Sequence, residues 1–204
     1  CYQKSQTNRK NTIINKNATR LFHCSNMQLH IDTDATYLAA PNSKSRVAGY
    51  YYLSQYYKPT PKIPTPILNA PFHIECHLLQ HVVSSAAEAE TAGIFHNCQT
   101  AIPIIRMLEA LGHNQHTIPI KADYSISVTF SDSMLKQKRS KSWGMRLNWL
   151  KDRVQQKQFY IFWDRGSNNI ADYATKHFPP SYHQKIRPSY VLKNNFMHMT
   201  DMWA

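Results

Sequence analysis

The chain has 204 residues, 42% of them hydrophobic, and its 24 Lys and Arg outnumber its 12 Asp and Glu to give a formal net charge of +12. This length suits one globular domain with its own core, while the 5 glycines and 11 prolines exclude a collagen-like or low-complexity chain. No apolar run approaches the roughly 18 residues of a membrane-spanning helix. The basic excess favours a polyanionic partner, nucleic acid before an anionic membrane. A basic protein without such a partner has the same composition.

The cysteines and the ends of the chain indicate its compartment and its domain organisation. The four cysteines lie far apart, at Cys1, Cys24, Cys76 and Cys98. Without a Cys-x-x-Cys pair they predict free thiols in a reducing compartment, not a zinc site or a disulfide framework. Because the chain begins with Cys and no signal-peptide pattern follows, we interpret it as a piece of a longer polypeptide. We expect a poorly ordered lead-in at 1–20, one domain at 21–192 and a tail at 193–204.

The first half of the domain predicts three strands. From Met27 onward apolar and polar residues alternate, which is the period of a strand. The tyrosine-rich run 47–53 predicts a second strand, and 71–79 a third. The four prolines of 58–70 exclude a helix or a central strand between the second and third strands.

The second half predicts helices that alternate with strands. Ser84 and Ser85 precede a run of good helix formers, so we expect a helix N-cap there and a helix end at Gly112. Pro103 either kinks this helix or begins a second one. The remaining elements are a strand at 117–122, a helix at 143–155, a strand at 159–163 and a short closing helix at 169–177. This order indicates a mixed α/β domain.

Four carboxylates occupy positions typical of a metal site. They are Asp34, Glu90, Asp123 and Asp172, which lie at the ends of predicted strands and on predicted helices. In an α/β sheet the carboxyl ends of strands gather at one edge, where crowded carboxylates repel one another unless a divalent cation binds them. Oxygen ligands favour Mg²⁺ or Mn²⁺, and a pair of such ions clamps a phosphate. The plainer interpretation is an ordinary stabilising role at helix starts.

Five stretches of the sequence resemble one family. They are LHIDTDATYLAAPNSKSRVAGYYYLS, HVVSSAAEAETAGIFHNCQTAIPIIRMLEALG, PIKADYS, LKQKRSKSWGMRLNWLKDRV and IFWDRGSNNIADYATKHFPPSYHQKIRP. They resemble the ribonuclease H domain at the C-terminal end of copia-type retrotransposon polyproteins. The combination of Ser-Ser-x-x-Glu-Ala-Glu with Ala-Asp-Tyr-x-Thr-Lys-His is the most specific part. The resemblance implies a ribonuclease H-like α/β fold with a mixed five-stranded sheet flanked by helices.

The resemblance also implies an activity and its residues. It implies cleavage of the RNA strand of RNA/DNA hybrids during retrotransposon reverse transcription, with two Mg²⁺ ions or Mn²⁺ in their place. Asp34 resembles the first-strand aspartate, Glu90 the first-helix glutamate, Asp123 the fourth-strand aspartate and Asp172 the aspartate before the last helix. These four are therefore expected to be both catalytic residues and metal ligands. A retroviral-type integrase core is set aside because its glutamate comes last.

The chain departs from the family at three points, of which Tyr124 and the lead-in at 1–20, which does not resemble the family, keep a second function open, while the four retained carboxylates favour the nuclease. The family usually has Asn after the third acid, where this chain has Tyr124. The mobile His before the fourth acid of cellular relatives has no counterpart. The alternative is a catalytically silent remnant that binds nucleic acid or serves as a structural part of a reverse transcriptase. The implied partners are an RNA/DNA hybrid and the reverse transcriptase portion of the parent polyprotein, with no membrane, in a cytoplasmic retrotransposon particle or in the nucleus.

Basic side chains complete the predicted site. The candidates for phosphate contacts are Lys136, Lys138, Arg139, Lys141 and Arg146, with Arg46 a weaker one. A run of this kind is either a solvated helix face or a surface that follows a nucleic-acid backbone, and we favour the second. Asp32 lies two residues before Asp34, on the same face of the strand. We interpret it as a solvated carboxylate in preference to a further metal ligand.

Overall fold

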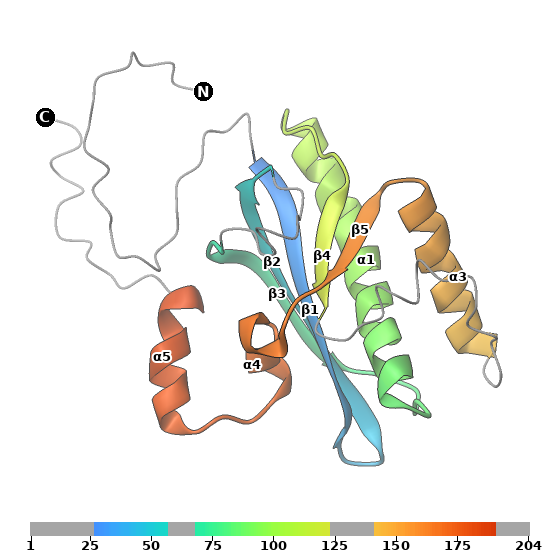
Figure 1. Ribbon diagram of the computed structural model, residues 1–204, viewed down its shortest axis with the longest axis vertical. Coiled ribbons are helices and arrows are strands. Elements are labelled where there is room, and N and C mark those ends of the chain that lie inside the picture. The colour runs from blue at the N-terminus through green and yellow to red at the C-terminus, as the bar shows by residue number, and fades with distance from the viewer. Residues whose placement is uncertain (1–26, 57–67, 123–140, 191–204) are drawn as a thin grey trace, which may run out of the picture.

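The computed structural model describes residues 27–56, 68–122 and 141–190. Its strands are β1 (Met27–Ala40), β2 (Lys44–Gln55), β3 (Pro71–Leu78), β4 (Ile118–Ala122) and β5 (Phe159–Trp163). Its helices are α1 (Ala86–Ala110), α3 (Lys141–Gln155), α4 (Asp172–Thr175) and α5 (Pro180–Tyr190), with a 3-10 turn at Gly166–Asn168. Figure 1 shows α1 and α3 on one side of the sheet and α4 and α5 on the other.

The five strands form one mixed sheet in the order β3-β2-β1-β4-β5. β1 pairs antiparallel with β2, and β2 with β3. β4 runs parallel to both β1 and β5. This confirms the expected fold class, α/β with a mixed five-stranded sheet flanked by helices.

Alternation along β1 divides its side chains between the two faces of the sheet. Leu29 and Ile31 point toward α1 and pack in the main core with Ile94 and Ile120. Burial of such aliphatic side chains is the largest favourable contribution to folding. The even-numbered residues of this part of β1 point to the opposite face of the sheet. They are Gln28, His30, Asp32 and Asp34, all buried despite their polarity.

The second face of the sheet is covered by the C-terminal segment. Tyr50 and Tyr52 of β2 pack there against Ile170 and Ala171, and Tyr190 of α5 lies against this cluster. The hydroxyl of Tyr190 donates to the Ile170 carbonyl at 2.7 Å. This segment therefore buries the polar face of β1, which is where the candidate site lies.

The helix boundaries confirm some predictions and correct others. Ser85 is the N-cap of α1, and its hydroxyl accepts from the Glu88 N–H at 3.1 Å. The helix continues through Pro103 as one element. Gly112 follows its C-cap with φ +88, a conformation that glycine adopts without strain. The short helix expected at 169–177 is present as α4, but it does not close the fold, because a further helix, α5, follows it. No described helix is long and apolar enough to cross a membrane.

Candidate active site

The site is built where β1 extends beyond its shorter neighbour. β1 has 14 residues and β4 has 5. Their pairing ends with Thr33 opposite Ala122, the last residue of β4, so Asp34 is the first residue of β1 past this ladder. Asp123 follows Ala122 in the sequence and lies outside the described residues. The expectation that Asp34 ends its strand was wrong, because β1 continues to Ala40 and Asp34 lies in its middle, paired with Ala48 of β2.

The short helix α4 brings a second carboxylate to Asp34. The hydroxyl of Thr175 in α4 donates a hydrogen bond to Asp34 Oδ2. The segment before α4 is fixed to β1 as well, because Asn169 Nδ2 donates to the Thr33 carbonyl at 2.7 Å. These contacts bring Asp172, at the start of α4, close enough to act electrostatically on Asp34. Two predicted site residues 138 positions apart in the sequence thus lie together.

The Asp34 carboxyl is strongly perturbed by this environment. Asp34 is 1% exposed, and burial, together with the smaller effect of the Asp172 carboxyl, raises its pKa to about 7. The hydrogen bond from Thr175 and the charge of Lys176 lower the pKa in part. Asp34 Oδ1 and Asp172 Oδ1 are buried without a hydrogen-bond partner among the described residues. A buried acceptor without a donor is costly, so this pair is suited to a cationic ligand.

Lys176 supplies positive charge to both carboxylates. Its Nζ lies 2.7 Å from Asp172 Oδ2 and 3.8 Å from Asp34 Oδ1. Sequence reasoning had assigned this lysine no role. The signal was its spacing four residues after Asp172, which places two side chains of opposite charge on one side of a helical turn.

Glu90 lies on the helix that packs over β1, on the side of the sheet opposite α4 and α5. It lies on α1 and is buried. One turn later, a Cβ built at Gly93 would lie 3.6 Å from the Asp34 carbonyl oxygen and 3.5 Å from Ala35 Cβ, so α1 passes directly over β1 here. Glu88 has a different role, because its Oε2 accepts from the N–H and the hydroxyl of Ser84, both at 2.8 Å. The choice of Glu90 over Glu88 for the site stays a prediction.

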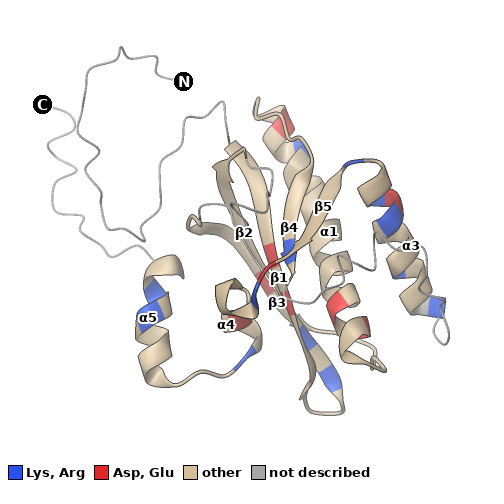
Figure 2. Ribbon diagram, viewed as in Figure 1, with Lys and Arg blue, Asp and Glu red and all other residues tan. Residues whose placement is uncertain are grey.

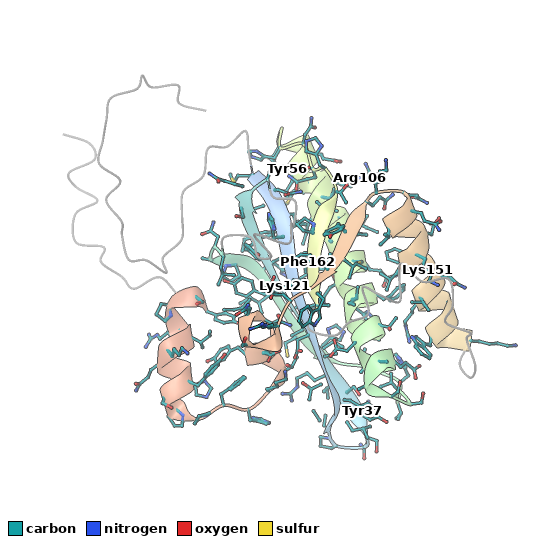
Figure 3. All side chains as sticks on the ribbon, viewed as in Figure 1. Tyr37, Tyr56, Arg106, Lys121, Lys151 and Phe162 are labelled. Atoms are coloured by element: carbon teal, nitrogen blue, oxygen red, sulfur yellow. The ribbon has the colours of Figure 1, made fainter. Side chains whose placement is uncertain are left out.

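Asp32 forms a separate ion pair on the same face of β1. Its Oδ2 lies 2.5 Å from Lys121 Nζ, and both side chains are almost completely buried. The lysine also donates to the Asn168 carbonyl at 2.9 Å, and Figure 3 shows it between the sheet and the C-terminal segment. The prediction of a solvated Asp32 was wrong, because that segment covers it. A lysine inside the apolar strand IPIKA was the signal that a buried partner exists.

The predicted four-carboxylate cluster is described only in part. Asp34 and Asp172 are brought together, and Glu90 lies on the helix that covers β1. Within the described residues no group of three or more His, Cys, Asp or Glu is arranged to hold a metal. Asp123 is outside those residues. The four-ligand site therefore stays a prediction.

The predicted phosphate-binding residues have different surroundings. Lys141 begins α3 and is exposed, while Arg46 lies on β2 opposite Thr36. Arg146 is packed, with Nη1 3.0 Å from His81 Nε2 and its guanidinium 5.9 Å from the Phe95 ring centre. Lys136, Lys138 and Arg139 lie outside the described residues. Figure 2 shows Lys and Arg at the closed end of the β1–β2 hairpin and acidic residues in the middle of the sheet.

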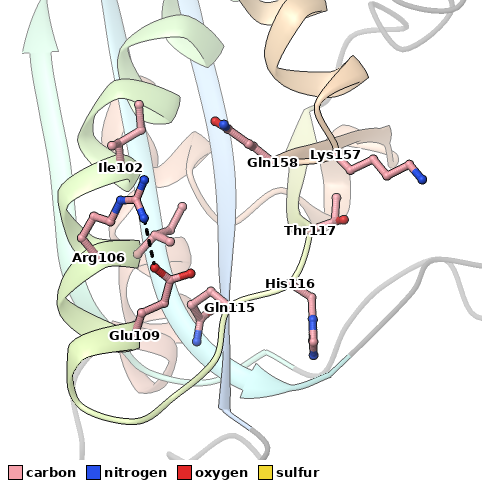
Figure 4. A pocket seen from close by; sticks show the side chains of 9 residues that line it. Ile102, Arg106, Glu109, Gln115, His116, Thr117, Lys157 and Gln158 are labelled. Atoms are coloured by element: carbon pink, nitrogen blue, oxygen red, sulfur yellow. Dashed lines mark ion pairs between the residues drawn. The ribbon is translucent and has the colours of Figure 1, made fainter.

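A pocket lies at the other end of the sheet from these carboxylates. Thr117 and Gln158, which precede β4 and β5, line it together with the end of α1. Arg106 Nη1 and Glu109 Oε2 form an ion pair there at 3.5 Å (Figure 4). Since Asp34 follows the opposite end of the β4 ladder, this pocket is not part of the candidate site.

The chain matches no protein-family model and no curated protein. Among solved structures, it is similar to the N-terminal RNase H domain of a Mycobacterium tuberculosis protein, at 14% identity and a TM-score of 0.45, covering 73% of this chain and 91% of that one. LC11-RNase H1 in complex with an RNA/DNA hybrid is similar at 8% identity and a TM-score of 0.45, and the match covers 72% of this chain and 92% of that one. Prototype foamy virus protease–reverse transcriptase is similar at 13% identity and 0.46, covering 85% of this chain but 22% of that protein. At these TM-scores the likenesses carry no argument about activity.

Proposed function

We propose that this chain is a metal-dependent endonuclease that cleaves the RNA strand of RNA/DNA hybrids during retrotransposon reverse transcription. The observation that carries the proposal is the pair of the buried Asp34 and the partly exposed Asp172, which meet beside the sheet. Each of these carboxyls has a buried oxygen, Oδ1, that accepts no hydrogen bond from a donor among the described residues. The sequence motifs of the copia-type ribonuclease H domain contain both residues.

The donor set fits a hard divalent cation. Carboxylate oxygens are the ligands that Mg²⁺ and Mn²⁺ prefer, and the two unsatisfied oxygens belong to groups that repel each other. Asp34 and Asp172, with Glu90 and Asp123, would hold two such ions. When bound, a pair of these ions activates a water molecule and stabilises the charge of the attacked phosphate.

The residues around the pair would orient it for this chemistry. Thr175 fixes one oxygen of Asp34 by a hydrogen bond, which leaves Oδ1 for a ligand. Asn169 ties the segment before α4 to β1, so that Asp172 is held against Asp34 by backbone contacts and not by the ligand alone. Such support from surrounding residues is what keeps metal-binding carboxylates in place.

The basic side chains would hold the substrate backbone. Lys141 and Arg46, with the run Lys136, Lys138 and Arg139 and with Arg146, would contact phosphates and release counterions on binding. Phosphate contacts position a duplex without reading its bases. The proposed partners are therefore the hybrid and the reverse transcriptase portion of the same polyprotein, in a cytoplasmic retrotransposon particle or in the nucleus.

A cleavage assay tests the proposal. A hybrid with a 5′-labelled RNA strand is incubated with the full chain over a Mg²⁺ series, beside matched RNA and DNA duplexes. We expect cleavage of the hybrid RNA alone, dependent on the metal and reduced to background in Asp34→Asn. Lys185→Gln, an exposed change on α5, is the control and should cleave normally. Hybrid binding without cleavage at any Mg²⁺ or Mn²⁺ concentration would contradict the proposal and favour the silent remnant.

A further inference from the structure

Lys176 lies within ion-pair distance of both carboxylates of the Asp34–Asp172 pair. It follows α4 as its C-cap residue, with extended backbone at φ −112 and ψ 157. From there its side chain turns back toward the start of the helix. Nζ reaches Asp172 Oδ2 at 2.7 Å and Asp34 Oδ1 at 3.8 Å. One ammonium group therefore contacts two acids that come from different parts of the chain.

The contact to Asp34 is made at the oxygen that a metal would use. Thr175 donates to Oδ2 of Asp34, while Oδ1 has the longer ion pair with Lys176 and accepts no hydrogen bond from a donor among the described residues. An ammonium and a divalent cation at this oxygen would repel each other strongly in a buried place. Lysine and metal therefore compete for the same pair of carboxylates.

The exposure of Lys176 allows it to leave. Its side chain is 38% exposed, so Nζ can swing into water on a flexible stem at little desolvation cost. Lys121 differs on this point, because its side chain is 4% exposed and is also tied to the Asn168 carbonyl. Lys121 is therefore buried in the protein interior, whereas Lys176 lies at the surface.

We propose that Lys176 is an internal counter-ion, which neutralises the Asp34–Asp172 pair in the metal-free protein and is displaced when a divalent cation binds. This inference rests on the metal site of the proposed function. It implies that Lys176 weakens metal affinity and stabilises the metal-free state. A lysine that merely positioned Asp172 for the metal would have the opposite effect on affinity.

The first test measures Mn²⁺ binding without nucleic acid. Free Mn²⁺ is followed by its electron paramagnetic resonance signal, at fixed low ionic strength, for the full chain, Lys176→Gln and the control Lys185→Gln. We expect Lys176→Gln to bind Mn²⁺ about tenfold more tightly, because a nearby positive charge is removed. Its melting temperature without metal should fall, and the rise on adding Mn²⁺ should exceed that of the unaltered chain. Lys176→Arg, which keeps the charge, should bind Mn²⁺ as weakly as the unaltered chain or more weakly.

A second test uses the unaltered protein and needs no variant to fold. Lysines are acetylated briefly with and without saturating Mn²⁺, and the modified positions are read by mass spectrometry. Displacement predicts faster acetylation of Lys176 with metal, while Lys185 keeps its rate. Equal or weaker Mn²⁺ binding by Lys176→Gln, or unchanged reactivity of Lys176, would overturn the inference and leave the proposed function intact. Absence of Mn²⁺ binding by the unaltered chain and by Lys176→Gln would overturn both.

Discussion

Asp32 and Asp34 lie on one strand, point to the same face of the sheet and are each 1% exposed, yet their surroundings differ. Asp32 has a buried lysine at 2.5 Å. Burial raises the pKa of Asp32, and the charge and hydrogen bond of Lys121 counter part of that rise. Asp34 has a second carboxyl as neighbour and a half-exposed lysine at 3.8 Å. Equal burial therefore does not mean an equal role. Asp32 has a structural role because the buried Lys121 neutralises it, while Asp34 has no such fixed counter-charge among the described residues.

The two aspartates receive their described counter-charges from different elements. Asp32 lies opposite Lys121 in the parallel ladder of β1 with β4. Asp34 lies two residues further along β1, where the structure describes no residue of β4. Among the described residues its counter-charge comes from Lys176, which belongs to the C-terminal segment and not to the sheet.

The largest expected effect comes from breaking the Asp32 pair. Lys121→Met leaves a buried carboxylate without its counter-charge, which costs about 3–5 kcal/mol of unfolding free energy. Lys176→Gln removes a partly exposed lysine and should cost about 1 kcal/mol or less. Urea unfolding at pH 7 in the presence of a chelator measures both. Equal losses in the two variants would remove the distinction between the carboxylates.

Asp34→Asn should act in the opposite direction and stabilise the metal-free protein. Burial and the Asp172 carboxyl raise the pKa of Asp34 to about 7 in the fold, from 3.8. The folded state then binds the proton more tightly than the unfolded state, so stability falls as the pH rises from about 4 to about 7. The asparagine variant does not undergo this loss and should be more stable at pH 8 by up to about 4 kcal/mol.

The same substitution at the other carboxylate is the control for this prediction. Asp32→Asn leaves Lys121 buried without its carboxylate partner and should destabilise at pH 8. Thermal unfolding from pH 4 to pH 8 with a chelator follows both variants. If Asp34→Asn were less stable than the unaltered chain at pH 8, the Asp34 carboxylate would be a stabilising group like that of Asp32.

His30 is a third buried titratable residue on the same face of β1 as Asp32 and Asp34. Burial lowers its pKa to about 4, so the folded state holds it neutral while the unfolded chain binds a proton near pH 6.5. Stability is therefore complete above about pH 6.5 and falls as the pH drops toward 4. Between pH 7 and pH 5 this residue should account for about 1–2 kcal/mol. The loss should be missing in His30→Gln, measured by urea unfolding, and its persistence there would contradict the assignment.

The smallest effect concerns the helix that passes over Asp34. A Cβ at Gly93 would meet Ala35, Val47 and the Asp34 carbonyl at 3.5–3.6 Å, which is ordinary contact. Gly93→Ala should therefore stabilise by about 0.5–1 kcal/mol, since glycine is unfavourable within a helix. Gly49→Ala should destabilise, because its Cβ would lie 2.1 Å from Asn97 Oδ1. Thermal unfolding compares the two variants. A lower stability of Gly93→Ala would mean that α1 packs more tightly over β1 than these distances indicate.

Local patterns in the sequence predicted most of the elements. The alternation from Met27, the cap at Ser85 and the glycine at Gly112 each depend on neighbouring residues, and each is confirmed. The extra helix α5 was not predicted; it begins at Pro180, the second residue of a Pro-Pro pair. Proline is well tolerated in the first turn of a helix.

The contacts that define the site could not be predicted in the same way. Lys121 and Asp32 are 89 residues apart in the sequence, and Thr175 and Asp34 are 141 apart. Such pairs depend on the register of β1 with β4 and on where α4 returns to the sheet. Motif resemblance named Asp34 and Asp172 as site residues, but only the fold assigns Asp32 a buried counter-charge and places Lys176 at the pair.

The most direct test of the account is the position of Mn²⁺ in crystals of the full chain grown with that ion. An anomalous difference map locates the metal independently of any activity. The account predicts a peak at bonding distance from Asp34 Oδ1 and an oxygen of Asp172, with Lys176 Nζ moved away and Asp32 still paired with Lys121. A saturating Mn²⁺ concentration that leaves Asp34 bound only to Thr175 and Lys176, in a protein that cleaves the hybrid, would contradict it.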